Sequence, residues 1–174
     1  CNRREVDQAV AVRDLKRFAA DYVHAHAGEY EDLIPASAAS QGKKVAVVGG
    51  GPAGLTAAHD LIRMGYGVTV FDSQEKLGGM LRYGIPAYRL PDDVLDREIQ
   101  YVADLGVQMK PGTSVGDPAK LLEGGFDAAF IGVGAWKSRS LGIPGEDAPQ
   151  VLGGLAFLHE VNSGRKVAVG PEVV

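Results

Sequence analysis

Residues 45–58 constrain the fold of this chain more than any other stretch. Four apolar residues, 45–48, predict a strand that is buried on both faces. A glycine turn follows, with Gly49, Gly51 and Gly54 in the spacing GxGxxG, and a helical pattern comes directly after it. In such a turn the first glycine permits a tight bend, the second lets backbone approach a pyrophosphate, and the third lets helix and strand pack closely. The candidate ligand-binding residues of the turn are Gly49, Gly50, Gly51, Pro52, Ala53 and Gly54.

An acidic residue follows at the distance that a dinucleotide site requires. Residues 68–71 predict a second strand, and Asp72 ends it, 18 residues after Gly54. In dinucleotide-binding folds a carboxylate at this place accepts hydrogen bonds from a ribose. A glycine turn alone is weak evidence, and Asp72 alone could be a solvated charge at a strand end. Strand, turn, helix and acid together predict a dinucleotide site.

Composition excludes several classes of function. The net charge of −4 gives no basic surface for nucleic acid or an anionic membrane. The apolar runs have the length of strands, so we expect neither a transmembrane helix nor a signal peptide. The single cysteine excludes a disulfide framework and a Cys-x-x-Cys redox pair, and it suits a reducing cytoplasm.

The remaining pattern predicts a helical arm followed by an α/β domain. Residues 9–27 have the stripe of an amphipathic helix that Gly28 would end, and residues 35–42 resemble a linker, so we place a boundary near residue 40 between segments 1–40 and 41–174. Further expected elements are a helix from Asp92 to Gly106, a strand at 107–109, a weak helix at 117–123, a buried strand at 126–133 and a helix at 155–162. The chain begins with Cys1 and ends in a strand-like segment, so we expect a piece of a longer protein.

Three further groups are candidates for ligand contact. The glycine pair at 78 and 79 would let backbone pass close to a ligand, although it could equally form an ordinary turn. Residues 81–91 have no period and predict a long ordered loop, in which Arg82 and Arg89 face either a ligand or solvent. Gly134 follows a strand and is therefore expected at the same sheet edge as Gly49. Lys137 and Arg139 beside it could neutralise a pyrophosphate but are more typical of solvated cations.

Several blocks together resemble the small subunit of NADPH-dependent glutamate synthase and the related flavin module of dihydropyrimidine dehydrogenase. They are residues 1–4, 13–22, the Gly49 turn, 78–86, 88–91 and 134–147, so the resemblance covers essentially the whole chain. It implies a Rossmann-like FAD-binding domain of three layers with a parallel sheet. It also implies that the pyrophosphate of FAD meets residues 49–53.

The resemblance carries further residues and cofactors. Gly79 and Met80 match a second FAD contact, Arg89 matches an arginine that touches the cofactor, and Val115 matches a position whose backbone meets adenine. Asp72 stands where the family usually has Glu, one methylene longer. The resemblance also implies an NADPH or NADH domain beyond Val174.

Cys1 matches the last of four cysteines that hold a [4Fe–4S] cluster, so the arm would be the remnant of an iron–sulfur domain. One thiolate cannot hold such a cluster alone. The implied partner is a large catalytic subunit or a ferredoxin-like electron partner.

Three functions remain open. The first is an FAD-binding part of an oxidoreductase that passes electrons from NAD(P)H to iron–sulfur clusters, with no catalytic side chain required. The second is an NAD-binding dehydrogenase domain that uses the same turn and Asp72, and the third is a non-catalytic electron-transfer or docking module.

Overall fold

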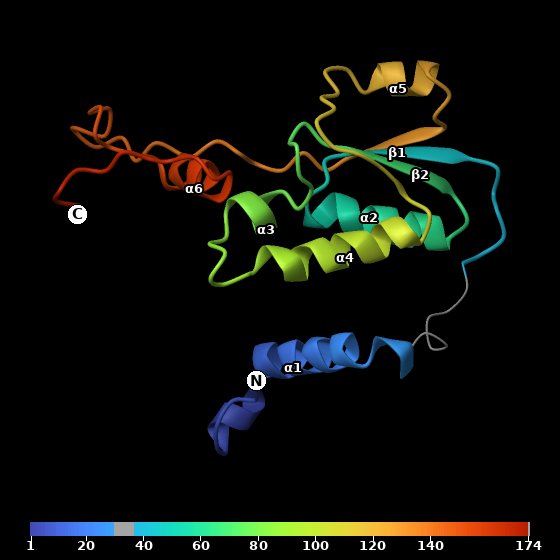
Figure 1. The fold of residues 1–174 in the computed structure, drawn as a ribbon, viewed down its shortest axis with the longest axis horizontal. Coiled ribbons are helices and arrows are strands. Elements are labelled where there is room, and N and C mark those ends of the chain that lie inside the picture. The colour runs from blue at the N-terminus through green and yellow to red at the C-terminus, as the bar shows by residue number, and fades with distance from the viewer. Residues whose placement is uncertain (30–36, 174) are drawn as a thin grey trace. The chain divides into compact units, whose positions relative to one another are not determined.

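The computed structural model describes residues 1–29 and 37–173 (Figure 1). The chain divides into two compact units, Cys1–Ala36 and Ser37–Val174, which are described separately. The predicted linker at residues 35–42 lies in part outside the described residues. Within the described ranges, no helix is long and apolar enough to cross a membrane.

The first unit consists of short helical segments. They are the 3-10 helix η1 (Asn2–Glu5), the helix α1 (Val12–Ala25) and the 3-10 helix η2 (Ala27–Glu29). The predicted helix therefore starts three residues later and ends two residues earlier than expected, and Gly28 lies in η2 rather than at the end of α1. Apolar residues of α1 such as Leu15 and Phe18 are exposed. The assignment of the helical arm, residues 1–40, to an iron–sulfur domain stays a prediction.

A four-stranded parallel sheet forms the centre of the second unit (Figure 1). Its strands are β1 (Lys44–Val48), β2 (Gly67–Phe71), β3 (Gln108–Lys110) and β4 (Ala128–Ile131), in the order β3-β2-β1-β4. All three strand pairs are parallel, and Val47 lies between Val70 on one side and Phe130 on the other. Chain order reverses between β1 and β4, and ligands bind at such switch points in open α/β sheets.

Helices cover both faces of the sheet, so the predicted three-layer α/β fold is confirmed. The helices α2 (Pro52–Arg63) and α4 (Asp92–Asp104) lie on one face, and the short α5 (Ala119–Glu123) lies on the other (Figure 1). Two more helices, α3 (Met80–Tyr83) and α6 (Gly154–Asn162), contact each other beyond the end of the sheet. As expected from the sequence, Gly106 follows α4 with a positive φ of 102°.

The core lies between the central strands and the helices α2 and α4. Its buried residues are Val47, Ala58, Val68, Val70, Leu77, Val102 and Val107. Val47 and Val70 are fully buried because β1 and β2 have a strand on each side and helices across their face. The core therefore fixes the two strands whose carboxyl ends carry the glycine turn and Asp72.

Two sequence-based expectations are wrong. The segment 126–133 was expected to be a buried strand, but Ile131 of β4 is 50% exposed, because β4 is an outer strand that pairs with β1 alone. Segment 81–91 was expected to lack regular structure, but Leu81, Arg82 and Tyr83 belong to α3. A helix of four residues is too short to show a helical repeat of apolar residues in the sequence, and the glycine and proline residues around it predict a loop.

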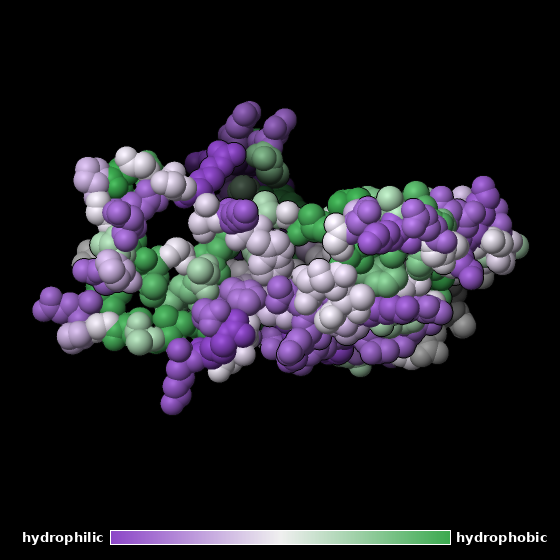
Figure 2. Space-filling view, turned by 90° about the horizontal axis from the view of Figure 1, so that it is seen from above, coloured by the Kyte–Doolittle hydropathy of each residue, from purple (hydrophilic) through white to green (hydrophobic). Residues whose placement is uncertain are grey.

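Apolar side chains beyond β4 also reach the surface. Figure 2 shows them gathered over the C-terminal part of the chain, at the left of the view. The exposed residues of this part include Leu141, Ile143, Val151, Leu152 and Val161.

The carboxylate of Glu146 organises a turn formed by residues 140–146. The side chain of Glu146 accepts hydrogen bonds from the Ser140 hydroxyl (2.7 Å) and from the backbone N–H groups of Leu141 (2.7 Å) and Gly142 (2.8 Å). These bonds favour the charged form, so they lower the pKa of Glu146 below its usual value of 4.5, with the Ser140 hydroxyl as the largest cause.

The turn should therefore open in acid. A carboxyl group whose folded pKa is depressed contributes stability above its unfolded pKa, and loses it as the pH falls through the folded pKa. We expect the amide resonances of Leu141 and Gly142 to shift together in NMR spectra as the pH falls below 4.5. In Glu146→Gln these resonances should be displaced already at pH 7, and they should not shift as the pH falls. If they still shift with pH as in the unaltered chain, the role of the Glu146 carboxylate in the turn is contradicted.

Candidate functional site

A cavity of about 300 Å³ lies at the carboxyl edge of the sheet. Segments that follow all four strands line it, together with the start of α3. The lining residues are Val48 at the end of β1 with Gly49, Gly51, Pro52 and Ala53 after it, Phe71 at the end of β2 with Asp72 and Ser73 after it, Thr113, Ser114 and Val115 after β3, Gly132, Val133, Gly134 and Trp136 after β4, and Gly79 with Met80. The volume is at the lower end of the range for small-molecule sites.

The glycine turn is shaped by close approaches of backbone. Gly49 has a φ of 108°, and a Cβ there would lie 2.3 Å from the carbonyl oxygen of Gly132. A Cβ on Gly54 would lie 1.8 Å from the carbonyl oxygen of Gly49. Gly49 thus makes the bend and Gly54 the close packing of α2, as the spacing predicts.

A second glycine loop closes onto this turn. The N–H of Gly78 donates to the carbonyl of Gly50 (2.8 Å), and a Cβ on Gly79 would lie 2.8 Å from the Cα of Gly51. Gly79 has a φ of 53°, so the position favours glycine for conformational reasons as well. A Cβ on Gly51, by contrast, would meet only the Cα of Gly79, at 3.7 Å. Gly51 therefore presents bare backbone to the cavity without being needed for packing.

Asp72 joins the strand end to the turn. Its side chain is 7% exposed, its Oδ2 accepts from the N–H of Gly50 (2.7 Å), and its Oδ1 accepts from the N–H of Gln74 (2.8 Å). The N–H of Thr113 donates to its backbone carbonyl (2.7 Å). Each carboxylate oxygen keeps a second lone pair, so a ribose hydroxyl at the cavity can still donate to it.

The first turn of α2 faces the same cavity through Pro52 and Ala53. Proline at the first helical position lacks the N–H that a helix start leaves unpaired. The following N–H groups and the helix dipole favour an anion at this end. The N-terminus of α2, which favours an anion, therefore lies at the middle of the cavity, and the carboxylate of Asp72 lies on its β2 side.

Most of the predicted binding residues meet at the cavity. Those that line it are Gly49, Gly51, Pro52, Ala53, Asp72, Gly79, Met80, Val115 and Gly134, while Gly50 and Gly54 belong to the turn but do not line the cavity. Arg89 is exposed and does not line the cavity, and its cofactor contact stays a prediction. The exposed residues Lys137 and Arg139 do not line it either. Thr113, Ser114 and Trp136 were missed, because strand ends alone do not reveal which loop residues turn inward.

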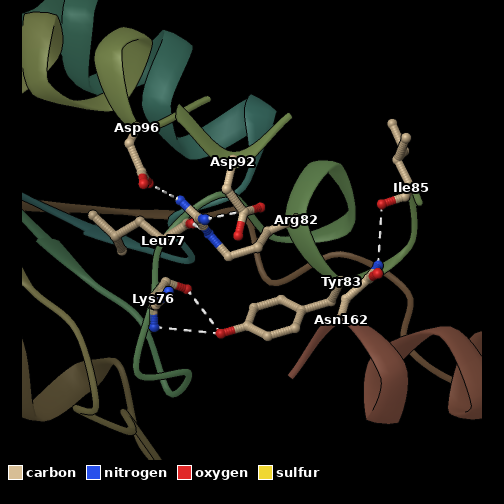
Figure 3. Close-up of polar contacts among 8 residues, drawn as sticks. All are labelled: Lys76, Leu77, Arg82, Tyr83, Ile85, Asp92, Asp96 and Asn162. Carbon is tan, nitrogen blue, oxygen red and sulfur yellow. Dashed lines mark hydrogen bonds and ion pairs between the residues drawn. The ribbon is translucent and has the colours of Figure 1, made fainter. Parts of the chain in front are cut away.

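The prediction that Arg82 faces a ligand or solvent is wrong. The residue is 4% exposed, and its Nε donates to the carbonyl of Leu77 (2.6 Å). The guanidinium forms ion pairs with Asp96 and with Asp92 (Nη1 to Oδ1, 3.4 Å) at the start of α4 (Figure 3). Arg82 therefore ties the loop that carries Gly78 and Gly79 to α4.

Tyr83 anchors the same loop from the other side of α3. Its hydroxyl lies 3.2 Å from the carbonyl oxygen and 3.3 Å from the backbone nitrogen of Lys76, and it donates to the first and accepts from the second (Figure 3). Burial raises the pKa of the Tyr83 phenol, and the hydrogen bond to Lys76 opposes that rise in part. The phenol thus stays neutral at physiological pH and acts as a structural tie.

The described residues offer no ready metal centre. Cys1 is exposed and free, and within 1–29 and 37–173 no group of three or more His, Cys, Asp or Glu side chains could hold a metal ion. A [4Fe–4S] cluster takes four thiolates, so Cys1 alone does not fit one.

Replacement of Arg82 tests whether the buried guanidinium and its ion pairs with the exposed carboxylates of Asp92 and Asp96 hold the glycine loop. Arg82→Met leaves the carbonyl of Leu77 without its donor and Asp92 and Asp96 without their cation, so we expect a loss of about 1–3 kcal/mol in the free energy of unfolding. Arg97→Met is the matched control, because Arg97 is half exposed and pairs at 3.6 Å with an exposed carboxylate, Asp93. Its loss should stay within about 0.5 kcal/mol in urea unfolding. Equal losses would contradict the role of Arg82.

Comparison with known proteins places this geometry in a family context. A family model described as an NAD(P)-binding Rossmann-like domain matches residues 47–111. The beta subunit of NADP(+)-dependent formate dehydrogenase from Moorella thermoacetica is 38% identical over 100% of this chain and 28% of that protein. The glutamate synthase [NADPH] small chain from Escherichia coli is 42% identical over 67% of this chain and 25% of its own length. The subunit PreT of NAD-dependent dihydropyrimidine dehydrogenase from Salmonella typhimurium is 38% identical over 83% of this chain and 34% of its length.

Solved structures of two other proteins have a fold similar to that of this chain. FprA from Mycobacterium tuberculosis, in complex with NADPH, has a TM-score of 0.63 at 25% identity, over 70% of this chain and 29% of that one. A 2-naphthoyl-CoA reductase has a TM-score of 0.63 at 27% identity, over 82% of this chain and 21% of that one. The chain thus spans about a quarter to a third of the sequence relatives that it matches. The model of an NAD(P)-binding Rossmann-like domain thus matches the part of the chain that holds the glycine turn and Asp72, and the chain is homologous to the glutamate synthase small chain and to the dihydropyrimidine dehydrogenase subunit PreT.

Proposed function

We propose that this chain is the FAD-binding portion of an NAD(P)H-dependent oxidoreductase similar to the glutamate synthase small chain. The observation that carries the proposal is the contact of two glycine loops at one cavity, where Gly79 lies directly against Gly51. This contact leaves a stretch of bare backbone beside the start of α2. Such a surface suits the pyrophosphate of a dinucleotide.

The residues present fit one half of a dinucleotide. Asp72 would accept from the adenosine ribose, the backbone of Val115 would meet adenine, and residues 49–53 would hold the pyrophosphate. Gly79 and Met80 would make the second contact, and Arg89 is proposed as a further one. When bound, FAD supplies the chemistry, because it accepts a hydride and releases electrons singly. The role of this chain is to bind it, orient it and exclude water.

The names of the relatives support a flavin rather than a nicotinamide alone. One relative, 38% identical over 100% of this chain, is the NADPH-Fe(3+) oxidoreductase subunit beta of Geobacter sulfurreducens. NADPH releases a hydride, whereas Fe(3+) takes one electron, so a carrier that handles both steps is needed between them. The NADPH or NADH site itself is proposed outside the chain described here, beyond Val174.

A second candidate is an NAD-binding dehydrogenase domain. The description of the matching family model favours it, since the same turn and Asp72 bind nicotinamide dinucleotides. The glycine pair at 78 and 79 favours FAD over this alternative, because the resemblance to the glutamate synthase family assigns a cofactor contact to Gly79 and the adjacent Met80.

The partners are proposed from the relatives and from the first unit. Several relatives are beta or small subunits, which favours a large catalytic subunit or a ferredoxin-like electron partner in the cytoplasm. The exposed apolar residues of α1, among them Leu15 and Phe18, also suit a docking module without catalysis of its own. Cys1 is proposed as one of the four ligands of a [4Fe–4S] cluster whose other ligands are not among the residues described here.

Replacement of Gly51 tests the proposal without disturbing the fold. A Cβ at Gly51 has room at 3.7 Å from its neighbour but points bulk at the backbone that would hold the pyrophosphate. We expect Gly51→Ala to unfold in urea like the unaltered chain and to lose FAD affinity tenfold or more in equilibrium dialysis, an effect of about 1.4 kcal/mol.

Gly154→Ala is the matched control, because a Cβ at Gly154 meets nothing within 4 Å and the residue lies outside the cavity. Its FAD affinity should equal that of the unaltered chain. An unaltered chain that takes NADPH but refuses FAD would favour the dehydrogenase alternative. Equal FAD affinity in both variants would contradict the assignment of the turn.

A further inference from the structure

We propose that Trp136 is a positioning residue for the half of the dinucleotide that extends beyond the pyrophosphate, away from adenosine. The proposal rests on the proposed function, because it takes the ligand to be FAD. It assigns the indole ring as the surface against which the ring-bearing half of the ligand lies. Trp136 is the single tryptophan of the chain and was not among the residues predicted from the sequence.

The order of the strands sets the direction of the ligand. The lining segments follow β3, β2, β1 and β4 across the sheet edge, so Val115 and Asp72 lie on one side of the glycine turn and Trp136 lies on the other. If adenosine binds at Val115 and Asp72, the pyrophosphate meets the turn after β1. The rest of the molecule must then continue toward the segment after β4, where Trp136 lines the cavity.

The indole ring is held in place by its own backbone and by two other rings. Its Nε1 donates to the carbonyl of Val133 (3.0 Å), which fixes the turn after β4. Its ring centre lies 5.8 Å from that of Tyr83 and 5.8 Å from that of His159, the latter edge to face at 82°. Such pairs stabilise a defined orientation of both rings.

The two supporting rings are themselves fixed. Tyr83 is buried. Its hydroxyl forms hydrogen bonds with the backbone N–H and carbonyl of Lys76 (Figure 3). One ring nitrogen of His159, Nε2, lies 3.2 Å from Oε1 of Gln74, which follows Asp72 after β2. The side chain of Asn162 on α6 donates to the carbonyl of Ile85 (3.0 Å), two residues after the end of α3 (Figure 3). Helix α6 thus holds His159 against Trp136 from outside the sheet.

The two halves of the cavity therefore differ in chemistry. The adenosine side offers a carboxylate and backbone groups, whereas the β4 side offers the aromatic ring of Trp136 beside Gly132 and Gly134. An aromatic face favours a planar, apolar ring by packing and does not depend on a particular hydrogen-bond pattern. Trp136 should therefore affect ligands that carry a second ring system and leave adenosine diphosphates unaffected.

The test compares FAD with ADP, which shares only the adenosine half. Equilibrium dialysis of the 174-residue chain would give the dissociation constant of each ligand for the unaltered protein, Trp136→Leu and Trp136→Phe. We expect Trp136→Leu to weaken FAD about two- to tenfold, the range of an aromatic contact, and to leave ADP within about twofold. Trp136→Phe should recover most of the lost FAD affinity because it restores an aromatic face.

Two further variants guard against a general loss of structure. His159→Leu removes one ring that supports Trp136, so it should show the same selectivity for FAD over ADP with a smaller effect. Tyr101→Leu removes an aromatic residue of α4 that lies outside the cavity and should change neither constant. Selective loss in both Trp136→Leu and His159→Leu supports the positioning role.

Each contrary result has a distinct meaning. Equal weakening of FAD and ADP in Trp136→Leu, or no change in either, overturns the role of Trp136 and leaves the FAD proposal standing. A chain that binds NADPH and ADP but not FAD overturns the FAD proposal, and selective loss of NADPH in Trp136→Leu would then still support the position of the ring. A chain that binds none of the three contradicts both.

Discussion

The close approach of backbone to backbone at the carboxyl edge of the sheet is the constraint on which the rest of this structure depends. The carbonyl of Gly49 fills the space where Gly54 would carry a Cβ, and the carbonyl of Gly132 does the same for Gly49. The strands β1 and β4 and the helix α2 can meet only because no side chain stands between them. The same absence of side chains leaves polar backbone groups facing the cavity, so packing and ligand binding have one physical origin.

A second layer of interactions holds this edge from outside. Arg82 is buried between Leu77 and the first turn of α4, and it fixes the loop that presses Gly79 against Gly51. Asp72 holds the turn from the β2 side through the N–H of Gly50. A buried cation with two carboxylates and a carboxylate with backbone donors therefore act on opposite sides of one turn. Neither group is required to react; both keep the shape of the cavity.

The glycine turn and Asp72 at the carboxyl edge of the sheet could be predicted from the sequence, whereas the burial of Arg82, the exposure of β4 and the place of Trp136 could not. The turn and Asp72 could be predicted because strand, glycine spacing and acid follow one another locally along the chain. The burial of Arg82 could not be predicted, because it depends on contacts with Asp92 and Asp96. A loop separates these residues from Arg82 in the sequence, and α4 places them next to it in the structure. The exposure of β4 could not either, since an apolar strand such as 128–131 looks the same at the centre and at the margin of a sheet. Trp136 was missed because its place depends on Tyr83 and on His159, residues distant in sequence.

The most direct test of the dinucleotide site is an amide NMR spectrum of the 174-residue chain, recorded before and after addition of FAD. A site at the carboxyl edge predicts that the largest shifts fall on residues 49–54, 79–80, 113–115 and 132–136. Amides of the exposed face of α4 should keep their resonance positions. Shifts that cluster elsewhere, or a spectrum unchanged by FAD in excess, would contradict the central claim that the meeting glycine turns form the cofactor site.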